Sequence, residues 1–161
     1  MITDLNYKYD RERLKNEARY VSSNSIPFVT RHPSYIPEKY SSTEDFDKWV
    51  KTFNIGTYGK TIASYFEDLL GCEVRPRYYI QEKNFALPFH KDRGTQCCIN
   101  FVLSGSGDPI EFRSFVHYYK CALVNVQEEH KVTTSTKDRI LFKLSVDIDY
   151  DEALKKLHNF I

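Results

Sequence analysis

The sequence predicts an α+β fold, in which helices come first and a run of short antiparallel strands follows. In the first half of the chain, apolar residues recur at helical spacing. In the second half, short apolar runs are separated by turn residues. This order is typical of α+β domains whose strands form a β-sandwich or barrel. The chain of 161 residues has the length of one domain. We expect a helical part over about 1–72, a β core over about 73–147 and a short C-terminal helix.

The helical part begins with a charged segment at 10–20, where Leu14 and Ala18 lie four residues apart, as on one face of a surface helix. Residues 26–30 are expected to form a short strand. The run Ser-Thr-Glu-Asp at 42–45 has the composition of a helix start. Apolar residues follow it at helical spacing and predict a helix here: Phe46, Trp49, Val50 and Phe53.

A longer helix is expected to begin near Thr57 or Tyr58 and to end at Gly71. Glycine is common at the C-terminal end of helices because it adopts the left-handed conformation without strain. The apolar residues of this segment form one stripe: Ile62, Tyr65, Phe66, Leu69 and Leu70. We expect this stripe to pack against a sheet as part of the core.

The second half is divided by turn residues, most clearly at 104–109, which contains glycines and a proline. The strands expected there are Val74 to Gln81, Gln96 to Leu103, Ile110 to Phe115, Cys121 to Val126 and Arg139 to Val146. In the last strand, large apolar residues alternate with a second set that begins with Arg139, so Arg139 lies on the face opposite the apolar one. Residues 149–159 are expected to close the chain with a short helix.

The composition argues against several classes of protein. The formal net charge is +1, with 23 basic and 22 acidic residues, so a nucleic-acid partner is not expected. The chain has no long apolar stretch that would span a membrane, and its first ten residues are polar, unlike a secretory signal. The four cysteines contain no C-x-x-C pair, and Cys97 and Cys98 would point to opposite faces of a strand. We expect reduced thiols and a cytoplasmic protein.

The segment His90-Lys91-Asp92 is the first part of a candidate metal site. In an extended strand, residues two apart point to the same side, so an imidazole and a carboxylate would lie together. His130, 38 residues after Asp92, would complete a set of two histidines and one carboxylate. This is the ligand set of non-haem Fe(II) oxygenases.

Arg139 follows His130 by nine residues and would place a fixed cation near the metal. If its face of the strand is the interior of the barrel, a buried arginine needs an anionic partner. A bound carboxylate provides one with bidentate geometry, so Arg139 is a candidate anchor for a dicarboxylate cosubstrate.

Each of these residues also has a simpler interpretation. A single His-x-Asp occurs by chance in exposed loops, His130 stands among charged residues, and an arginine on a strand is commonly at the surface. Two other functions are compatible with the same residues. One is a non-catalytic, cupin-like protein that binds a metal or another ligand. The other is zinc-dependent hydrolysis, which gives no role to Arg139 and has no evident general base.

Taken together, residues from about Arg77 to Val146 resemble the double-stranded β-helix (jelly-roll, cupin-like) core of Fe(II)/2-oxoglutarate-dependent oxygenases. The most similar branches are the prolyl-hydroxylase-like and the aspartyl/asparaginyl-hydroxylase-like ones. The resemblance covers about seventy of the 161 residues, and the helical first half is similar to the helices that buttress one sheet in that family. The matching segments are Tyr78 to Ile80, Leu87 to Asp92, Ile99 to Leu103, Leu123 to Val126, His130 to Val132 and Arg139 to Leu141.

The resemblance implies three iron ligands: His90, Asp92 and His130. It also implies that Arg139 pairs with the distal carboxylate of 2-oxoglutarate. Members of the family often add a hydroxyl or amide donor to that carboxylate, and Tyr79 and Asn100 are the positions at which we expect it.

The implied activity is that of a dioxygenase (hydroxylase) that uses Fe(II), 2-oxoglutarate and O2 and releases succinate and CO2. The expected substrate is a small molecule or a peptide. An amino-acid or peptide side chain is the family-level expectation, with prolyl and aspartyl or asparaginyl residues first. The sequence does not indicate an oligomeric state.

Overall fold

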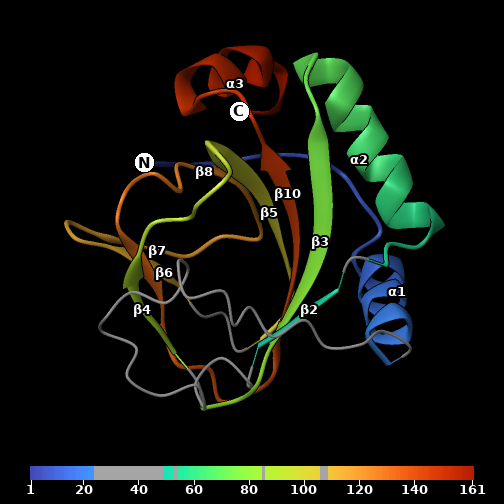
Figure 1. The fold of residues 1–161 in the computed structure, drawn as a ribbon, viewed down its shortest axis with the longest axis vertical. Helices are drawn as coiled ribbons and strands as arrows, with labels where there is room; N and C mark the ends of the chain where they lie inside the picture. Colours follow the sequence, from blue (N-terminus) through green and yellow to red (C-terminus); the bar gives the residue numbers. More distant parts are fainter. Residues whose placement is uncertain (24–48, 53, 85, 106–108) are drawn as a thin grey trace.

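Two antiparallel sheets and a layer of helices form the fold, which a computed structural model describes for residues 1–23, 49–52, 54–84, 86–105 and 109–161 (Figure 1). The larger sheet has six strands, in the order β1 (Ile2–Asp4), β8 (Cys121–Val124), β5 (Cys97–Ser104), β10 (Arg139–Val146), β3 (Val74–Gln81) and β2 (Trp49–Thr52). The smaller sheet has four strands, in the order β4 (Leu87–His90), β9 (His130–Val132), β6 (Ile110–Phe112) and β7 (Val116–His117).

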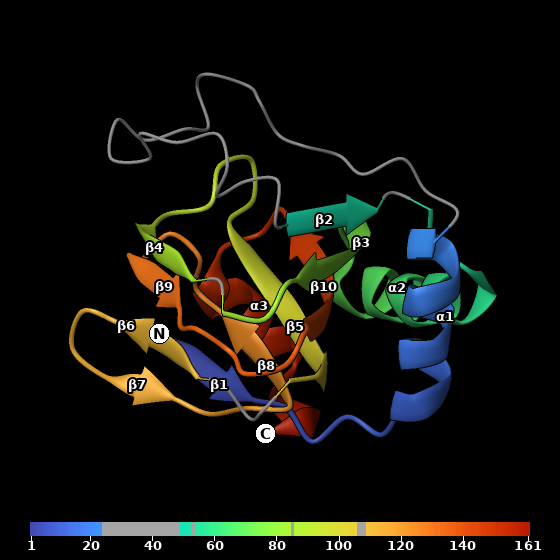
Figure 2. The same cartoon turned by 90° about the horizontal axis from the view of Figure 1, so that it is seen from below.

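Helices α1 (Arg11–Ser23) and α2 (Thr57–Leu70) lie on one side of the larger sheet and the smaller sheet lies on the other (Figure 2). Helix α3 (Tyr150–Lys156), followed by a 3-10 turn at His158–Phe160, lies at one end of β10 (Figure 1). Two facing antiparallel sheets with helices on the outer side of one of them fit a jelly-roll, cupin-like fold.

The main hydrophobic core lies between the helices and the larger sheet. It contains Leu14 of α1, Phe66 of α2 and Phe142 of β10, all fully buried. A smaller apolar cluster joins the two sheets: Cys98, Ile110, Phe112, Ala122, Val124 and Val126. Cys97 belongs to the main core and Cys98 to the smaller cluster, so the prediction that they point to opposite faces of a strand is confirmed.

Several predicted elements are confirmed. Strands β3 and β10 have the predicted bounds, and α2 begins at Thr57, one of the two predicted starts, and ends before Gly71. Gly71 ends α2 with a φ of 66°, and its N–H donates to the carbonyl of Glu67 at 2.8 Å. Helix α3 begins at Tyr150, because the Asp149 side chain accepts a hydrogen bond from the N–H of Glu152 at 2.8 Å.

The prediction of a helix through Trp49 and Val50 is wrong, because residues 49–52 form strand β2. This strand pairs with β3, with Trp49 opposite Gln81. A few apolar residues at helical spacing do not exclude a strand, and tryptophan, valine and threonine all favour one. The pairing with β3 therefore decides the conformation. The rest of this predicted helix and the predicted strand at 26–30 lie outside the described residues.

Two predicted strands are shorter than expected, and strands β1, β7 and β9 were not among the expected ones. The strand expected over 110–115 ends at Phe112, where a turn begins and the N–H of Phe112 donates to the carbonyl of Phe115 at 2.8 Å. The strand expected over 121–126 ends at Val124. Strand β1 forms from a polar stretch with no strand pattern, because it can pair with β8.

All four cysteines are free thiols. Burial raises the pKa of Cys98 and of Cys121 to about 12, so both thiols stay protonated at neutral pH. Within the described part of the chain, we find no helix that has both the length and the apolar character needed to cross a bilayer.

The start of α2 is held by a carboxylate from α1. Glu17 accepts hydrogen bonds from the backbone N–H groups of Tyr58 and Gly59, both at 2.9 Å, and from the hydroxyl of Tyr78 at 2.7 Å. The first N–H groups of a helix have no partner within the helix, and its dipole favours a negative charge at this end. Glu17 therefore joins α1, α2 and β3 at one point.

We expect Glu17→Ala to destabilise the protein by about 2–4 kcal/mol, because three donors lose a charged acceptor. Urea unfolding monitored by circular dichroism measures this change. Glu12→Ala is the matched control, since Glu12 is an exposed residue of the same helix that pairs only with Lys15 within the contacts described for it. Equal midpoints for the two variants would contradict the role given to Glu17.

Candidate metal centre

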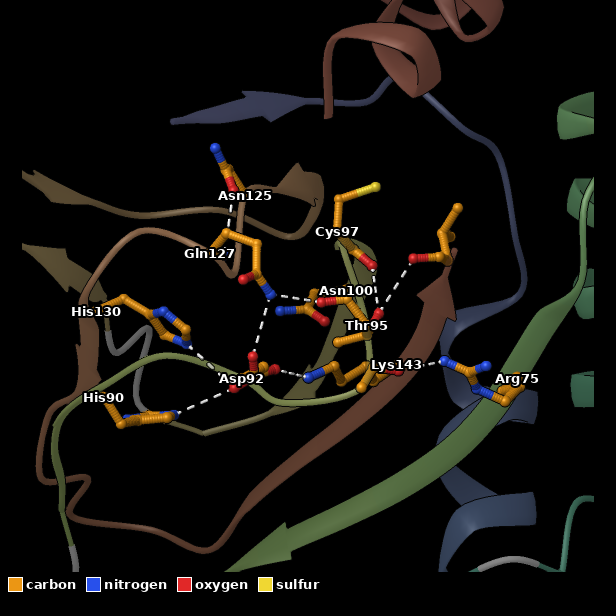
Figure 3. A network of polar contacts seen from close by, with 12 residues as sticks. Arg75, His90, Asp92, Thr95, Cys97, Asn100, Asn125, Gln127, His130 and Lys143 are labelled. Atoms are coloured by element: carbon orange, nitrogen blue, oxygen red, sulfur yellow. Dashed lines mark hydrogen bonds and ion pairs between the residues drawn. The ribbon is translucent and has the colours of Figure 1, made fainter. Parts of the chain in front are cut away.

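Three strand and loop segments bring the predicted ligands together (Figure 3). His90 is the last residue of β4 and His130 the first of β9, and these two residues are directly opposite each other in the strand pair. Asp92 lies in the loop after β4. Its backbone N–H donates to the carbonyl of Val126 at 3.0 Å, and its carbonyl accepts a hydrogen bond from the Gln127 side chain at 3.1 Å. The loop, rather than one continuous strand as expected, therefore positions the carboxylate.

The candidate ligand atoms lie close to one another. Nε2 of His90 is 3.4 Å from Oδ1 of Asp92, and Nε2 of His130 is 3.7 Å from the same oxygen. One ligand atom from each residue lies within 4.8 Å of the others. Ligand atoms that bind one metal ion at right angles to each other are about 3 Å apart. Small side-chain movements are therefore enough to form a site with two nitrogens and one carboxylate oxygen.

His130 has the tautomer and the charge state that metal binding requires. Its Nδ1 lies 2.9 Å from the carbonyl of Glu128, so Nδ1–H donates and the Nε2 lone pair faces Asp92. Burial lowers the pKa of His130 from 6.5 to about 4, although Asp92 acts in the opposite direction. The imidazole is therefore neutral at pH 7, and a backbone carbonyl holds its orientation, as is common for metal-binding histidines.

The Asp92 carboxylate is shared between two kinds of partner. Oδ1 faces the two imidazoles, whereas Oδ2 forms an ion pair with Nζ of Lys143 (Figure 3). Burial favours the uncharged form of both residues, but their mutual attraction outweighs it. The pKa of Asp92 lies well below its usual range, and that of Lys143 lies well above its own. Both groups are therefore charged at neutral pH.

A second polar cluster surrounds Arg139, which is only 3% exposed. Its Nη2 lies 3.4 Å from the hydroxyl of Tyr119, and Nδ2 of Asn100 donates to the same hydroxyl at 3.2 Å. Among the described residues, Nε and Nη1 of Arg139 and Oδ1 of Asn100 are inaccessible to solvent and have no hydrogen-bond partner. A buried guanidinium with unused donors is costly, and a carboxylate is the group that matches its geometry.

The two clusters share the inner face of the larger sheet. Arg139 and Lys143 lie four residues apart on the same face of β10, and Asn100 on β5 is opposite Lys143. Tyr79 on β3 is opposite Leu141, and its ring centroid lies 5.8 Å from Nζ of Lys143. Burial raises the pKa of Tyr79, so the phenol is neutral. The structure thus brings all six predicted site residues to one region.

The sequence interpretation missed three residues of this region. The first is Lys143, whose signal was present, since it shares the strand face of Arg139 and a lysine on an inner face also needs an anion. The second is Tyr119, one of twelve tyrosines in the chain, which no spacing marks. The third is Gln127, whose side chain bridges the carbonyls of Asp92 and Thr95 at 3.1 and 2.6 Å and has no signal in the sequence.

Known structures share this fold. A prolyl hydroxylase from Trichoplax adhaerens, in complex with a peptide fragment of the hypoxia-inducible-factor oxygen degradation domain, matches with a TM-score of 0.67 and 9% identity over 96% of this chain and 86% of that one. A prolyl-4-hydroxylase from Pseudomonas putida matches with a TM-score of 0.63 and 9% identity over 91% of each chain. The DMSP lyase DddQ from Ruegeria pomeroyi matches with a TM-score of 0.56 and 11% identity over 89% of this chain and 66% of that one.

The likeness is one of fold. No protein-family model and no curated protein matches the sequence. The similar structures include both hydroxylases and a lyase, so the fold by itself does not select an activity.

The buried, neutral His130 predicts a pH-dependent stability of the metal-free protein. In the unfolded chain the imidazole of His130 binds a proton near pH 6.5, whereas in the folded protein it does so only near pH 4. The contribution of His130 to stability is therefore complete above pH 6.5 and is lost as the pH falls toward 4, by at most about 1.4 kcal/mol per pH unit. Thermal unfolding at several pH values between 7 and 4.5 measures this slope.

In this pH range, His130→Gln is expected to flatten the dependence, whereas His158→Gln, which changes an exposed histidine, is expected to leave it unchanged. A slope that is the same in His130→Gln and in the native protein would show that another group is responsible.

Proposed function

We propose that this protein is a non-haem Fe(II)- and 2-oxoglutarate-dependent dioxygenase that hydroxylates an amino-acid or peptide side chain. The proposal includes a double-stranded β-helix core, which is consistent with the two facing antiparallel sheets. His90, Asp92 and His130 would hold the iron, and Arg139 would bind the distal carboxylate of 2-oxoglutarate. The cytoplasm is the proposed location.

The observation that carries the proposal is the unsatisfied guanidinium of Arg139 on the strand that also carries Lys143, the partner of Asp92. Two histidines and a carboxylate also occur in zinc sites, and these three residues alone do not select a metal. The buried guanidinium of Arg139 has free donors that match a planar anion. Zinc-dependent hydrolysis assigns no role to such a group, so Arg139 favours the oxygenase over zinc-dependent hydrolysis. A dicarboxylate that binds both the metal and Arg139 accounts for both clusters.

The residues of the chain have separate tasks in this reaction. Bound Fe(II) would supply the activation of O2, with one oxygen atom going to succinate and the other to the hydroxylated product. His130 and His90 would each offer a ring nitrogen to the metal, while Asp92 would offer its Oδ1. Arg139 would fix the orientation of 2-oxoglutarate, and Asn100 and Tyr119 lie beside it to complete the hydrogen bonds.

A peptide is the substrate that the comparisons favour. The Trichoplax adhaerens structure contains a peptide fragment bound to a prolyl hydroxylase. At 9% identity this is a proposal for the present chain, and prolyl, aspartyl and asparaginyl peptides are the first to test. The alternative is a non-catalytic, cupin-like protein that binds a metal or another ligand at the same residues.

A spectroscopic and product assay tests the proposed activity. Under anaerobic conditions, the protein with Fe(II) and 2-oxoglutarate is expected to show a weak charge-transfer band in the visible range. After O2 is added, succinate is expected at a slow rate without substrate and at a higher rate with the right peptide. A folded protein that binds iron but gives neither the band nor succinate would support the non-catalytic alternative.

Replacing Arg139 by alanine is expected to weaken 2-oxoglutarate binding by about 10- to 100-fold, because a charged bidentate contact is lost. Mn(II) affinity should change by less than about threefold, since Arg139 contacts none of the candidate ligands. Calorimetric titration of the metal-free protein with Mn(II), and of the Mn(II)-loaded protein with 2-oxoglutarate, measures the two values.

Arg139→Lys keeps the charge but not the bidentate geometry, so its affinity for 2-oxoglutarate should lie between those of the native protein and Arg139→Ala. Arg13→Ala is the control, because Arg13 is an exposed residue of helix α1 on the other side of the larger sheet. An unchanged 2-oxoglutarate affinity in Arg139→Ala would place the anchor elsewhere.

A further inference from the structure

Lys143 is a charged residue of the candidate centre to which the proposed reaction gives no task. Its side chain is only 13% exposed, and its ammonium group lies against Oδ2 of Asp92, which is itself 16% exposed. Tyr79 and Asn100 flank it on the neighbouring strands. A buried lysine in contact with a metal-ligating carboxylate changes the charge of the site, and this has consequences for what the site binds.

The two oxygens of the Asp92 carboxylate are unequal. Oδ1 lies 3.4 Å from Nε2 of His90 and 3.7 Å from Nε2 of His130, so it faces the place where a metal would be held. Oδ2 is already paired with the ammonium of Lys143. Asp92 therefore offers one oxygen to a metal ion, and its negative charge is neutralised before the ion arrives.

This charge balance opposes cations and favours anions. Lys143 cancels the charge of Asp92, and the buried Arg139 adds a positive charge on the same strand face. A divalent ion must enter beside an ammonium group, whereas a dicarboxylate would be attracted by Lys143, Arg139 and the metal together. Charges a few Å apart in a protein interior interact strongly, because solvent screens them little.

On the basis of the proposed function, we propose that Lys143 sets the balance between metal and cosubstrate binding. Its ammonium weakens the binding of a divalent metal ion and strengthens the binding of the dianionic 2-oxoglutarate to the metal-loaded centre. The two effects have opposite signs because one positive charge repels the metal cation and attracts the dianionic 2-oxoglutarate. A residue that only positioned Asp92 would instead favour both binding steps.

Lys143→Met tests the two signs directly, with Mn(II) as a redox-stable probe. We expect Mn(II) to bind about tenfold more tightly or better, and 2-oxoglutarate to bind the Mn(II)-loaded variant about tenfold more weakly, as follows from removing one charge close to both ligands. Calorimetric titrations of the metal-free and Mn(II)-loaded proteins give the two constants. Thermal unfolding of each metal-free variant shows whether it is folded.

Two further variants separate charge from hydrogen bonding. Lys143→Gln keeps a hydrogen-bond donor for Asp92 without the charge, so its two binding constants should resemble those of Lys143→Met. If Lys143→Met does not fold, Lys143→Gln takes its place in the test. Lys143→Arg keeps the charge and should stay within about threefold of the native constants. Lys91→Met is the matched control, since Lys91 is an exposed lysine next to Asp92, where screening makes the same charge change small.

The inference is overturned if Lys143→Met weakens Mn(II) binding, or if Lys143→Gln keeps the native constants, because both results indicate a positioning role. It is also overturned if the native protein binds no Mn(II) while Lys143→Met does, since the ammonium then takes the place of the metal. If 2-oxoglutarate does not bind the Mn(II)-loaded native protein, the proposed function fails, and the Mn(II) titrations still decide the effect of Lys143 on the metal.

Discussion

The alternation of side chains along β10 is the constraint on which the rest of the structure depends. This strand pairs with β3 on one side and β5 on the other, so it lies inside the larger sheet. Phe142 and Leu144 point into the core beneath the helices, while Arg139 and Lys143 point toward the smaller sheet. Because successive residues point to opposite faces, a shift of one residue in register would exchange the core with the site. Core packing therefore also fixes the position of both cations.

The candidate centre depends in turn on the charge of Asp92. A buried carboxylate would be unfavourable without a cation beside it, and Lys143 provides one. Arg139 has no carboxylate partner among the described residues, although it is more deeply buried than Lys143. The difference between these two cations, one satisfied and one not, separates the metal-binding side of the site from the side proposed to bind the carboxylate. The three candidate ligands alone do not distinguish these two sides.

The parts that sequence reasoning predicted correctly are those with a strong local pattern. Helix α2 has an apolar stripe and a terminal glycine, and β3 and β10 have clear limits in the sequence. Strand β2 was wrongly predicted as a helix because four residues at the edge of a sheet carry too little periodicity, and the neighbouring strand decides their conformation. The His90–Asp92 pair was predicted for one strand, but the strand ends at His90 and the loop hydrogen bonds hold Asp92 in place.

The sequence by itself indicated the helix α2, the strands β3 and β10, the two-sided character of the last strand, and His90, Asp92, His130 and Arg139 as candidate site residues. These follow from residue type and from periods of two and 3.6, which are local properties, whereas Tyr79 and Asn100 were expected only from the resemblance to a family. Only the tertiary structure decided that Lys143 pairs with Asp92, that Tyr119 lies between Arg139 and Asn100, and that Arg139 keeps unused donors. The physical reason is that burial and pairing of charges depend on residues from strands far apart in the sequence, which meet only when the sheets form.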